Sequence, residues 1–181
     1  MYFEVKGDNL GLPQHLAVDF RMRYISGNSS SAISAGRAPA GVSIAMANSV
    51  GISLWIGQDS LFLESSNQVI GDRTILRDTD NALHFYRIVI DGVNVGSAVT
   101  VWQDNEQILT GQTFSSQLAH GLVPRVSFGD ESILAQGVSE WQSFNVSAVP
   151  ESSTAVLAAC VLLVLALRHR SSPCGCGTAA A

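Results

Sequence analysis

Short apolar runs, separated by turn-forming residues, make up residues 1–148 of this 181-residue chain. The runs are rich in Val, Ile, Leu, Phe, Tyr and Trp, while Gly, Asn, Asp and Ser recur between them at intervals of roughly ten residues. None of these runs shows the sustained 3.6-residue apolar period of an amphipathic helix. The pattern is typical of an antiparallel sandwich or barrel, so we predict an all-β domain.

Residues Leu16–Ile25 show the clearest alternation. One face of the predicted strand carries the apolar residues Leu16, Val18, Phe20, Met22 and Tyr24. The other face is mostly polar and carries Ala17, Asp19, Arg21, Arg23 and Ile25. A strand with one solvated side has this pattern. Further strands are predicted at 1–6, Gly41–Ala47, Gly51–Gly57, Leu61–Glu64, Leu83–Asp91, Ala98–Trp102, Gln107–Thr110, Val123–Phe128 and Val138–Ala148. We expect connections at Ser26–Arg37 and Asp72–Asn81 and a turn at Gln103–Glu106.

The charge differs between the body and the tail of the chain. Residues 1–148 contain eight basic and fourteen acidic residues, while residues 149–181 contain Arg168, Arg170 and Glu151. An acidic body with no basic stripe argues against nucleic acid as a partner, because it cannot neutralise phosphates. All three cysteines, Cys160, Cys174 and Cys176, lie in the tail, so no disulfide is expected to hold the body together.

The first residues of the chain, 1–6, have no basic start and no apolar run of the kind that a secretory signal requires. They resemble a strand from within a domain. We therefore expect that the sequence begins downstream of the true start of the protein, and that a signal peptide precedes it.

The tail contains one long apolar segment. Thr154–Leu167 is uncharged and is followed by Arg168 and Arg170. Fourteen helical residues span about 21 Å, whereas a full bilayer core needs about 20 residues, so the segment is a marginal permanent span. A buried core helix is the alternative for a run of this length. The position after a complete β-domain, the lack of a polar face and the basic end favour a membrane helix, with the arginines on the cytoplasmic side.

Residues 149–170 resemble the PEP-CTERM sorting signal of exported bacterial proteins. The resemblance lies in the motif Val149-Pro150-Glu151, the apolar stretch and the arginine stop at Arg168 and Arg170. The family motif has a second proline where this chain has Ser152. The resemblance implies export, transient membrane retention, and recognition of Pro150 and Glu151 by an exosortase. It also implies an inner-membrane-anchored precursor and a final place at the cell surface or in a biofilm matrix, and we expect residues 171–181 to be disordered.

The body resembles laminin-G-like and concanavalin-type jelly rolls over residues 83–148. The residues that carry this resemblance are Phe85–Asp91, Val99–Asp104, Val126–Asp130 and Glu140–Val146. The resemblance implies a jelly-roll sandwich. The predicted organisation is then a sandwich at 1–148, a sorting signal at 149–170 and a tail at 171–181.

Catalytic and metal-binding patterns are weak in the body. Glycosidases place paired carboxylates about the scissile bond, but Asp78 and Asp80 lie in a polar connection, Asp130 and Glu131 are adjacent, and Glu140 is alone. We expect no cofactor. Calcium is the alternative, at Asp72, Asp78, Asp80 or Asp104, although aspartates also suit solvated turns. The four histidines, His15, His84, His120 and His169, are isolated in the sequence and are predicted to be structural or solvated.

Two hypotheses follow for the function. The first is a non-catalytic surface or matrix protein whose domain binds carbohydrate or another surface component. The second is a polysaccharide-active hydrolase or lyase of the same fold. The missing carboxylate pattern favours the first. The tryptophans Trp55, Trp102 and Trp141 could each stack against a sugar, but a core position is predicted for each of them.

Overall fold

A computed structural model describes eight ranges of the chain: 2–6, 15–27, 38–46, 49–66, 69–76, 79–115, 125–129 and 137–149. The chain divides into two compact units, residues 1–149 and residues 150–181. The second unit lies outside the described residues, and so does the apolar segment Thr154–Leu167. Within the described ranges, no helix is long and apolar enough to cross a membrane.

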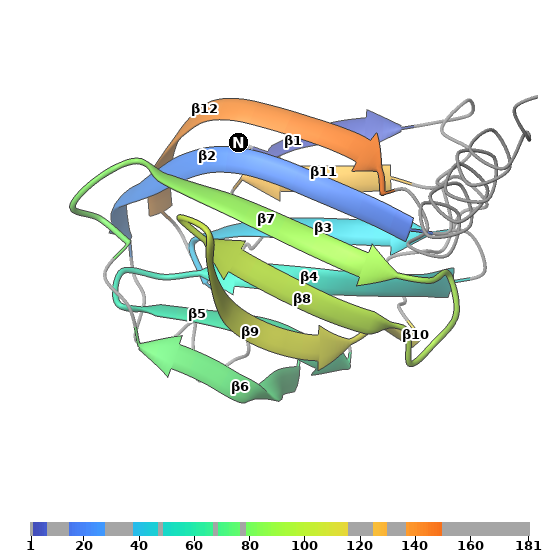
Figure 1. Cartoon of the computed structure of the whole chain (residues 1–181). Coiled ribbons are helices and arrows are strands. Elements are labelled where there is room, and N and C mark those ends of the chain that lie inside the picture. The colour runs from blue at the N-terminus through green and yellow to red at the C-terminus, as the bar shows by residue number, and fades with distance from the viewer. Residues whose placement is uncertain are drawn as a thin grey trace, which may run out of the picture. The chain divides into compact units, whose positions relative to one another are not determined.

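The first unit is a sandwich of two antiparallel sheets, so the prediction of an all-β sandwich is confirmed (Figure 1). Sheet A has the order β1-β11-β3-β4-β5-β6, with β10 also paired to β4, and sheet B has the order β12-β2-β7-β8-β9. The strands of sheet A are β1 (Tyr2–Lys6), β3 (Ala40–Met46), β4 (Val50–Ile56), β5 (Ser60–Ser66), β6 (Val69–Leu76), β10 (Phe114–Ser115) and β11 (Arg125–Gly129). Those of sheet B are β2 (His15–Gly27), β7 (His84–Asp91), β8 (Ala98–Gln103), β9 (Glu106–Gln112) and β12 (Gly137–Ala148).

One predicted connection is wrong. Residues Asp72–Asn81 were expected to be a polar loop, but Asp72 lies inside β6, which pairs with β5 through Phe62 opposite Thr74. Strand β6 is the last strand of its sheet. An edge strand accepts a polar centre more readily than a central one, because one side of it faces solvent. The apolar pairs at the two ends of β6, Val69-Ile70 and Ile75-Leu76, were the signal for the strand.

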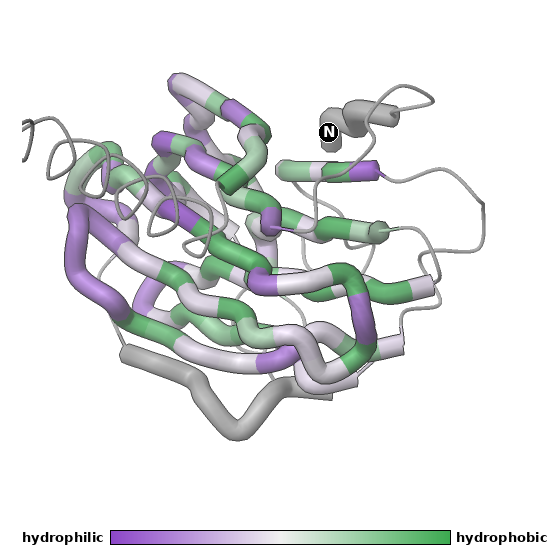
Figure 2. The backbone as a smooth tube through the Cα atoms, turned by 45° about the vertical axis from the view of Figure 1, so that its right-hand side comes forward, coloured by the Kyte–Doolittle hydropathy of each residue, from purple (hydrophilic) through white to green (hydrophobic). Residues whose placement is uncertain are grey.

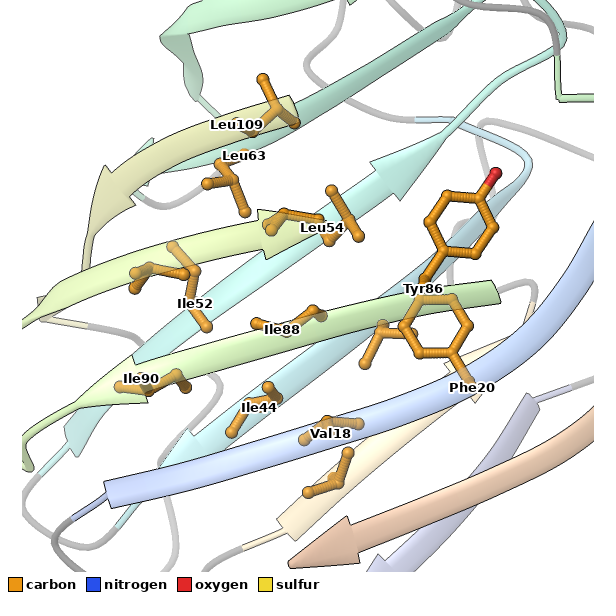
Figure 3. Close-up of a cluster of buried hydrophobic side chains, with 14 of the residues drawn as sticks. Val18, Phe20, Ile44, Ile52, Leu54, Leu63, Tyr86, Ile88, Ile90 and Leu109 are labelled. Carbon is orange, nitrogen blue, oxygen red and sulfur yellow. The ribbon is translucent and has the colours of Figure 1, made fainter. Parts of the chain in front are cut away.

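Alternating residues of both sheets meet in one core (Figure 3). The predicted inward face of β2 is confirmed: its five residues from Leu16 to Tyr24 are each 1% exposed or less. Strand β7 contributes Tyr86, Ile88 and Ile90, and the facing sheet contributes Ile44, Ile52 and Leu54. Figure 2 shows the same alternation as hydrophobic and hydrophilic colours along the strands. Full burial of one such aliphatic side chain contributes about 1.5–3 kcal/mol.

Aromatic rings join the two sheets at β11 and β12. The rings of Phe128 and Phe144 stack at 4.1 Å between centroids, and Phe128 also lies 5.0 Å from the ring of Trp141. Trp141 in turn contacts Phe20 at 5.4 Å. Trp141 therefore packs against the core, as predicted. Strand β12 is an edge of sheet B, and two irregularities interrupt its pairing with β2, at Val138/Ser139 and at Trp141/Ser143.

A second, small apolar cluster lies on the face of sheet A that points away from the core. Trp55 is 1% exposed and packs with Ala38 and Phe62, which is its cross-strand neighbour. Gly41 lies opposite Trp55, and a Cβ atom at position 41 would stand 2.9 Å from Trp55 Cε3 and 3.0 Å from the carbonyl oxygen of Leu54. The indole therefore lies across a position where only glycine leaves room for it.

We predict that Gly41→Ala lowers the free energy of unfolding by about 1–3 kcal/mol, because the added methyl group overpacks the contact with Trp55. In a Trp55→Leu background the same change should cost less, since the ring that it meets is gone. Urea denaturation of the four proteins in this double-mutant cycle measures the coupling. Equal costs in the two backgrounds would contradict the contact.

Tyr24 combines burial with two nearby carboxylates. Its hydroxyl is buried and has no hydrogen-bond partner among the residues that the structure describes. Burial, with the charges of Asp80 and Asp59 added to it, raises the pKa of Tyr24 above its ordinary value of 10.0. The folded state therefore holds this proton more tightly than the unfolded chain, and the stability that results is present below pH 10 and is lost as the pH rises further.

We predict that Tyr24→Phe leaves stability at pH 8 unchanged or slightly higher, because it removes a buried hydroxyl that bonds to nothing. Between pH 9 and pH 11, the variant should lose less stability than the natural protein. Urea midpoints across this range measure the difference. Parallel curves for the two proteins would show that Tyr24 ionises as freely in the fold as outside it.

Candidate binding face

The two sheets present different outer faces. On sheet A, the outward side chains Ser43, Ser53, Trp55, Phe62 and Glu64 are all 5% exposed or less. Ser43 and Ser53 share a hydrogen bond of 3.0 Å between their hydroxyl oxygens. This face combines polar and aromatic groups, but it is closed to solvent. The outer face of sheet B, by contrast, is open.

A continuous row of side chains crosses the open face of sheet B. Asp19 on β2 lies opposite Arg87 on β7, and Arg87 lies opposite Trp102 on β8. Residues directly opposite each other on antiparallel strands hold their Cβ atoms about 4.5–5.5 Å apart. Asn145 on β12 and Gln107 on β9 extend the row to both edges of the sheet, and both are exposed.

A second row lies beside the first. Arg21, two residues after Asp19, is exposed and faces Phe85, whose side chain is 36% exposed. We call Asp19, Arg21, Phe85, Arg87 and Trp102 together the sheet B band. It brings two guanidinium groups, two aromatic rings and one carboxylate onto three neighbouring strands.

The charges in the sheet B band are unequally exposed. The Asp19 side chain is 20% exposed, and its Oδ1 atom is buried, whereas the Arg87 side chain is 44% exposed. The Arg87 Nε and Asp19 Oδ1 atoms are 3.6 Å apart, which is an ion pair but too long for a hydrogen bond. The recessed carboxylate thus holds a cation at the surface, and the cation keeps its N–H donors.

Arg23, the next arginine on β2, forms a direct hydrogen bond with a carboxylate. Arg23 Nε donates to Glu140 Oε2 at 2.7 Å, across the pairing of β2 with β12. The partner of Glu140 is therefore an arginine, not a second carboxylate. At this partly exposed position the pair contributes little to stability, but it satisfies the charge of Arg23.

The calcium candidates that the structure describes are engaged within the protein. Asp104 Oδ1 accepts a hydrogen bond from the backbone N–H of Phe85 at 2.9 Å. Its other carboxylate oxygen, Oδ2, lies 2.6 Å from His84 Nδ1. Asp80 accepts a bond from the side-chain amide of Gln58 at 3.1 Å. Among the described residues, no three His, Cys, Asp or Glu side chains group together as metal ligands. Asp78 and the side chain of Asp72 lie outside the described part.

Two histidines are found in structural contacts. His84 bonds Asp104 with one ring nitrogen and Asn81 Oδ1 with the other, at 3.0 Å. Asp104 and Asn105 both have positive φ, of 51° and 70°, as a tight β8–β9 turn requires. The contact between His84 and Asp104 thus links the start of β7 to the β8–β9 turn. His15 forms an ion pair with Asp91 at the opposite end of β7.

The predicted sorting residues lie almost wholly outside the described part. Of Val149, Pro150, Glu151, Arg168 and Arg170, the structure describes Val149 alone. The N–H of Val149 donates to the carbonyl oxygen of His15 at 2.9 Å. The ladder between β12 and β2 therefore continues to the first residue of the sorting motif. His120 and His169 are also outside the described residues.

Sequence reasoning missed the sheet B band as a site. It placed Asp19, Arg21 and Arg23 on one face of a strand, but it could not give the pairing that brings Arg87 and Trp102 beside them. The core position predicted for Trp102 is wrong: this residue is half-buried on the outer face, next to Arg87. A signal was present in the alternation of Leu83–Asp91 and Ala98–Trp102, which separates Arg87 and Trp102 from their apolar neighbours.

No protein-family model and no curated protein matches the sequence. Solved structures with a similar arrangement include a galectin of Caenorhabditis elegans, with 8% identity and a TM-score of 0.47 over 81% of this chain and 89% of that one. A tetrameric galectin of the sponge Cinachyrella sp. has 14% identity and a TM-score of 0.41, over 83% and 100% of the two chains. The endo-β-1,4-glucuronan lyase of the fungus Trichoderma reesei has 12% identity and a TM-score of 0.46, over 82% and 74%. At such distances, a neighbour's ligand says nothing of the ligand of this chain.

Proposed function

We propose that the protein is an exported bacterial surface or matrix protein, processed at a PEP-CTERM-type tail, whose sandwich is a non-catalytic carbohydrate-binding domain. The sorting part is supported by the sequence order from Val149 to Arg170. It is also supported by the end of the fold, because the last backbone bond of the β12–β2 ladder uses the N–H of Val149. The predicted motif thus begins at the last described residue of the sandwich.

The order of the strands supports a jelly roll of the laminin-G-like, concanavalin-type class. The chain alternates between the sheets: β1 is in sheet A, β2 in sheet B, β3–β6 in A, β7–β9 in B, β10 and β11 in A, and β12 in B. A chain that passes several times between two antiparallel sheets forms a sandwich, and the jelly roll is one of the sandwich architectures. A fold of this class does not by itself specify a ligand.

The observation that carries the carbohydrate-binding proposal is the sheet B band. Sugars are held by flat aromatic surfaces against the apolar face of the ring and by polar groups that bond the hydroxyls. The sheet B band offers Trp102 and Phe85 for the first task. Arg87, with Asn145 and Gln107 at its flanks, offers donors and acceptors for the second. The only carboxylate in the band, Asp19, is recessed and paired with Arg87, which supports binding over catalysis.

The sorting proposal predicts processing that depends on an exosortase and on the motif. The chain is fused to a standard export signal and expressed in bacteria with and without an exosortase. Cell fractionation and immunoblotting then show where the protein is and whether it has been shortened. We expect a membrane-bound precursor without the enzyme and a shorter, released form with it. The double variant Pro150→Ala, Glu151→Ala should keep the precursor in both strains.

The control is Ser152→Pro, which restores the second proline of the family motif and should process at least as fast as the natural chain. Precursor that is converted equally in both strains, or a motif variant that is still converted, would reject sorting by this route.

The binding proposal predicts that Trp102→Ala weakens the affinity for whichever polysaccharide a glycan array identifies by about five- to tenfold, because a stacked ring contributes about 1 kcal/mol or more. Val95→Ala is the control, since Val95 is 60% exposed on the β7–β8 turn and lies outside the sheet B band. Affinity is measured by titration calorimetry. Equal affinity of both variants would place the ligand elsewhere.

The same polysaccharide decides between the two function hypotheses. We expect no release of reducing sugar or unsaturated product during prolonged incubation with the purified protein. Release that is abolished when a carboxylate is changed would replace the binding domain with a hydrolase or a lyase of the same fold.

A further inference from the structure

The outer face of sheet B carries more arginine than the rest of the chain leads one to expect. The protein has a formal net charge of −5 and ten Lys and Arg residues, three of which, Arg21, Arg23 and Arg87, lie on this face. We propose that the sheet B band binds an acidic saccharide, with the guanidinium groups of Arg21 and Arg87 bonding the carboxylates of uronic acid residues. This inference rests on the proposed carbohydrate binding and names the class of sugar.

Arg87 is prepared for an anionic ligand. The buried Oδ1 atom of Asp19 lies 3.6 Å from its Nε atom, so the carboxylate attracts the side chain without using its donors. Trp102 lies opposite Arg87 on β8, on the side away from Asp19. A guanidinium group already attracted to a fixed carboxylate loses less conformational entropy on binding, and its fork of N–H groups matches a second carboxylate in bidentate geometry.

Arg21 supplies a second cation that has no partner. Within the described residues, its guanidinium group has neither an ion pair nor a hydrogen bond, and its side chain is exposed. It lies opposite Phe85 and one row from Arg87, on the adjacent strand. The nearby acidic groups are otherwise engaged, because Glu140 bonds Arg23 and Asp104 bonds His84 and the N–H of Phe85. Asp19 balances the charge of Arg87, so the unbalanced positive charge of the sheet B band is that of Arg21, while Arg87 keeps its N–H donors.

The arrangement of the rings suits a sugar better than a simple anion. Phe85 and Trp102 lie on adjacent strands next to the two arginines, so an apolar surface borders each guanidinium group. A pyranose ring has one apolar face for stacking and, in a uronic acid, a carboxylate at its edge. Inorganic anions and carboxylate ions could use the arginines but gain nothing from the rings, and neutral sugars could use the rings but not the charges.

The test compares the binding of three soluble polymers to the 181-residue chain in detergent by calorimetry: a polyuronate, a sulfated polysaccharide and a neutral glucan. We expect the polyuronate to bind at least tenfold more tightly than the glucan, and to weaken as salt rises from 50 to 300 mM, since exposed charges are screened over about 10 Å at 0.1 M. Arg21→Ala should reduce polyuronate affinity about tenfold, the loss of one charged hydrogen-bonding group, and leave glucan affinity unchanged.

Arg23→Ala is the matched control. It removes the same type of residue from the same strand and the same face, and it is combined with Glu140→Gln so that no unpaired carboxylate is left. Because this site is already paired, the effect should stay under about twofold. Arg87→Lys keeps the positive charge opposite Asp19 but removes the paired N–H donors of the guanidinium group. This variant should lose polyuronate binding and keep the fold, which circular dichroism measures.

The outcomes separate the two proposals. No binding to any of the three polymers would reject the carbohydrate-binding function itself. Binding to glucan and polyuronate with equal affinity, or equal losses in Arg21→Ala and Arg23→Ala, would keep that function and reject the acidic ligand. Tighter binding to the sulfated polymer than to the polyuronate would also overturn the proposal, in favour of a site for sulfate esters.

Discussion

The pairing of β2 with β7 is the constraint on which the rest of the fold and the candidate site depend. Val18 lies opposite Ile88 in the core, and the next pair, Asp19 opposite Arg87, faces solvent. Because side chains alternate between the faces of a sheet, a slip of one residue would bring Arg87 inward and Ile88 outward. Burial of the Leu16–Tyr24 face thus fixes the register, and the register places the charged residues of the sheet B band side by side.

The fold class could be predicted from the sequence because alternation is a local signal. Each residue of β2 shows its face through its neighbours two positions away, so the sandwich and most of its strands could be inferred without a structure. Strand β6 was not predicted, because Asp72 and its polar neighbours resemble a loop in the sequence. Their place in a strand depends on pairing with β5. The two-residue strand β10 carries too little pattern to be recognised alone.

The candidate site could be predicted only in part, because it depends on contacts between segments that are far apart in the chain. The residues on β2 could be assigned to one solvated face. Arg87 and Trp102, however, lie more than sixty residues further along the chain, and nothing near them in the sequence indicates that they meet Asp19. The resemblance to a sorting motif is the opposite case, since the order of the residues that carry it, within about 22 positions, is visible in the sequence alone.

The two irregularities in β12 have a consequence for contacts between copies of the chain. A regular, straight edge strand is a template onto which another copy of the chain can add its own edge, and repeated addition leads to fibres. In β12 the two shifts of register interrupt the even spacing of the backbone N–H and C=O groups. An interrupted edge is a poorer template than a straight one, so this rim of the sandwich is less suited to the addition of a second copy.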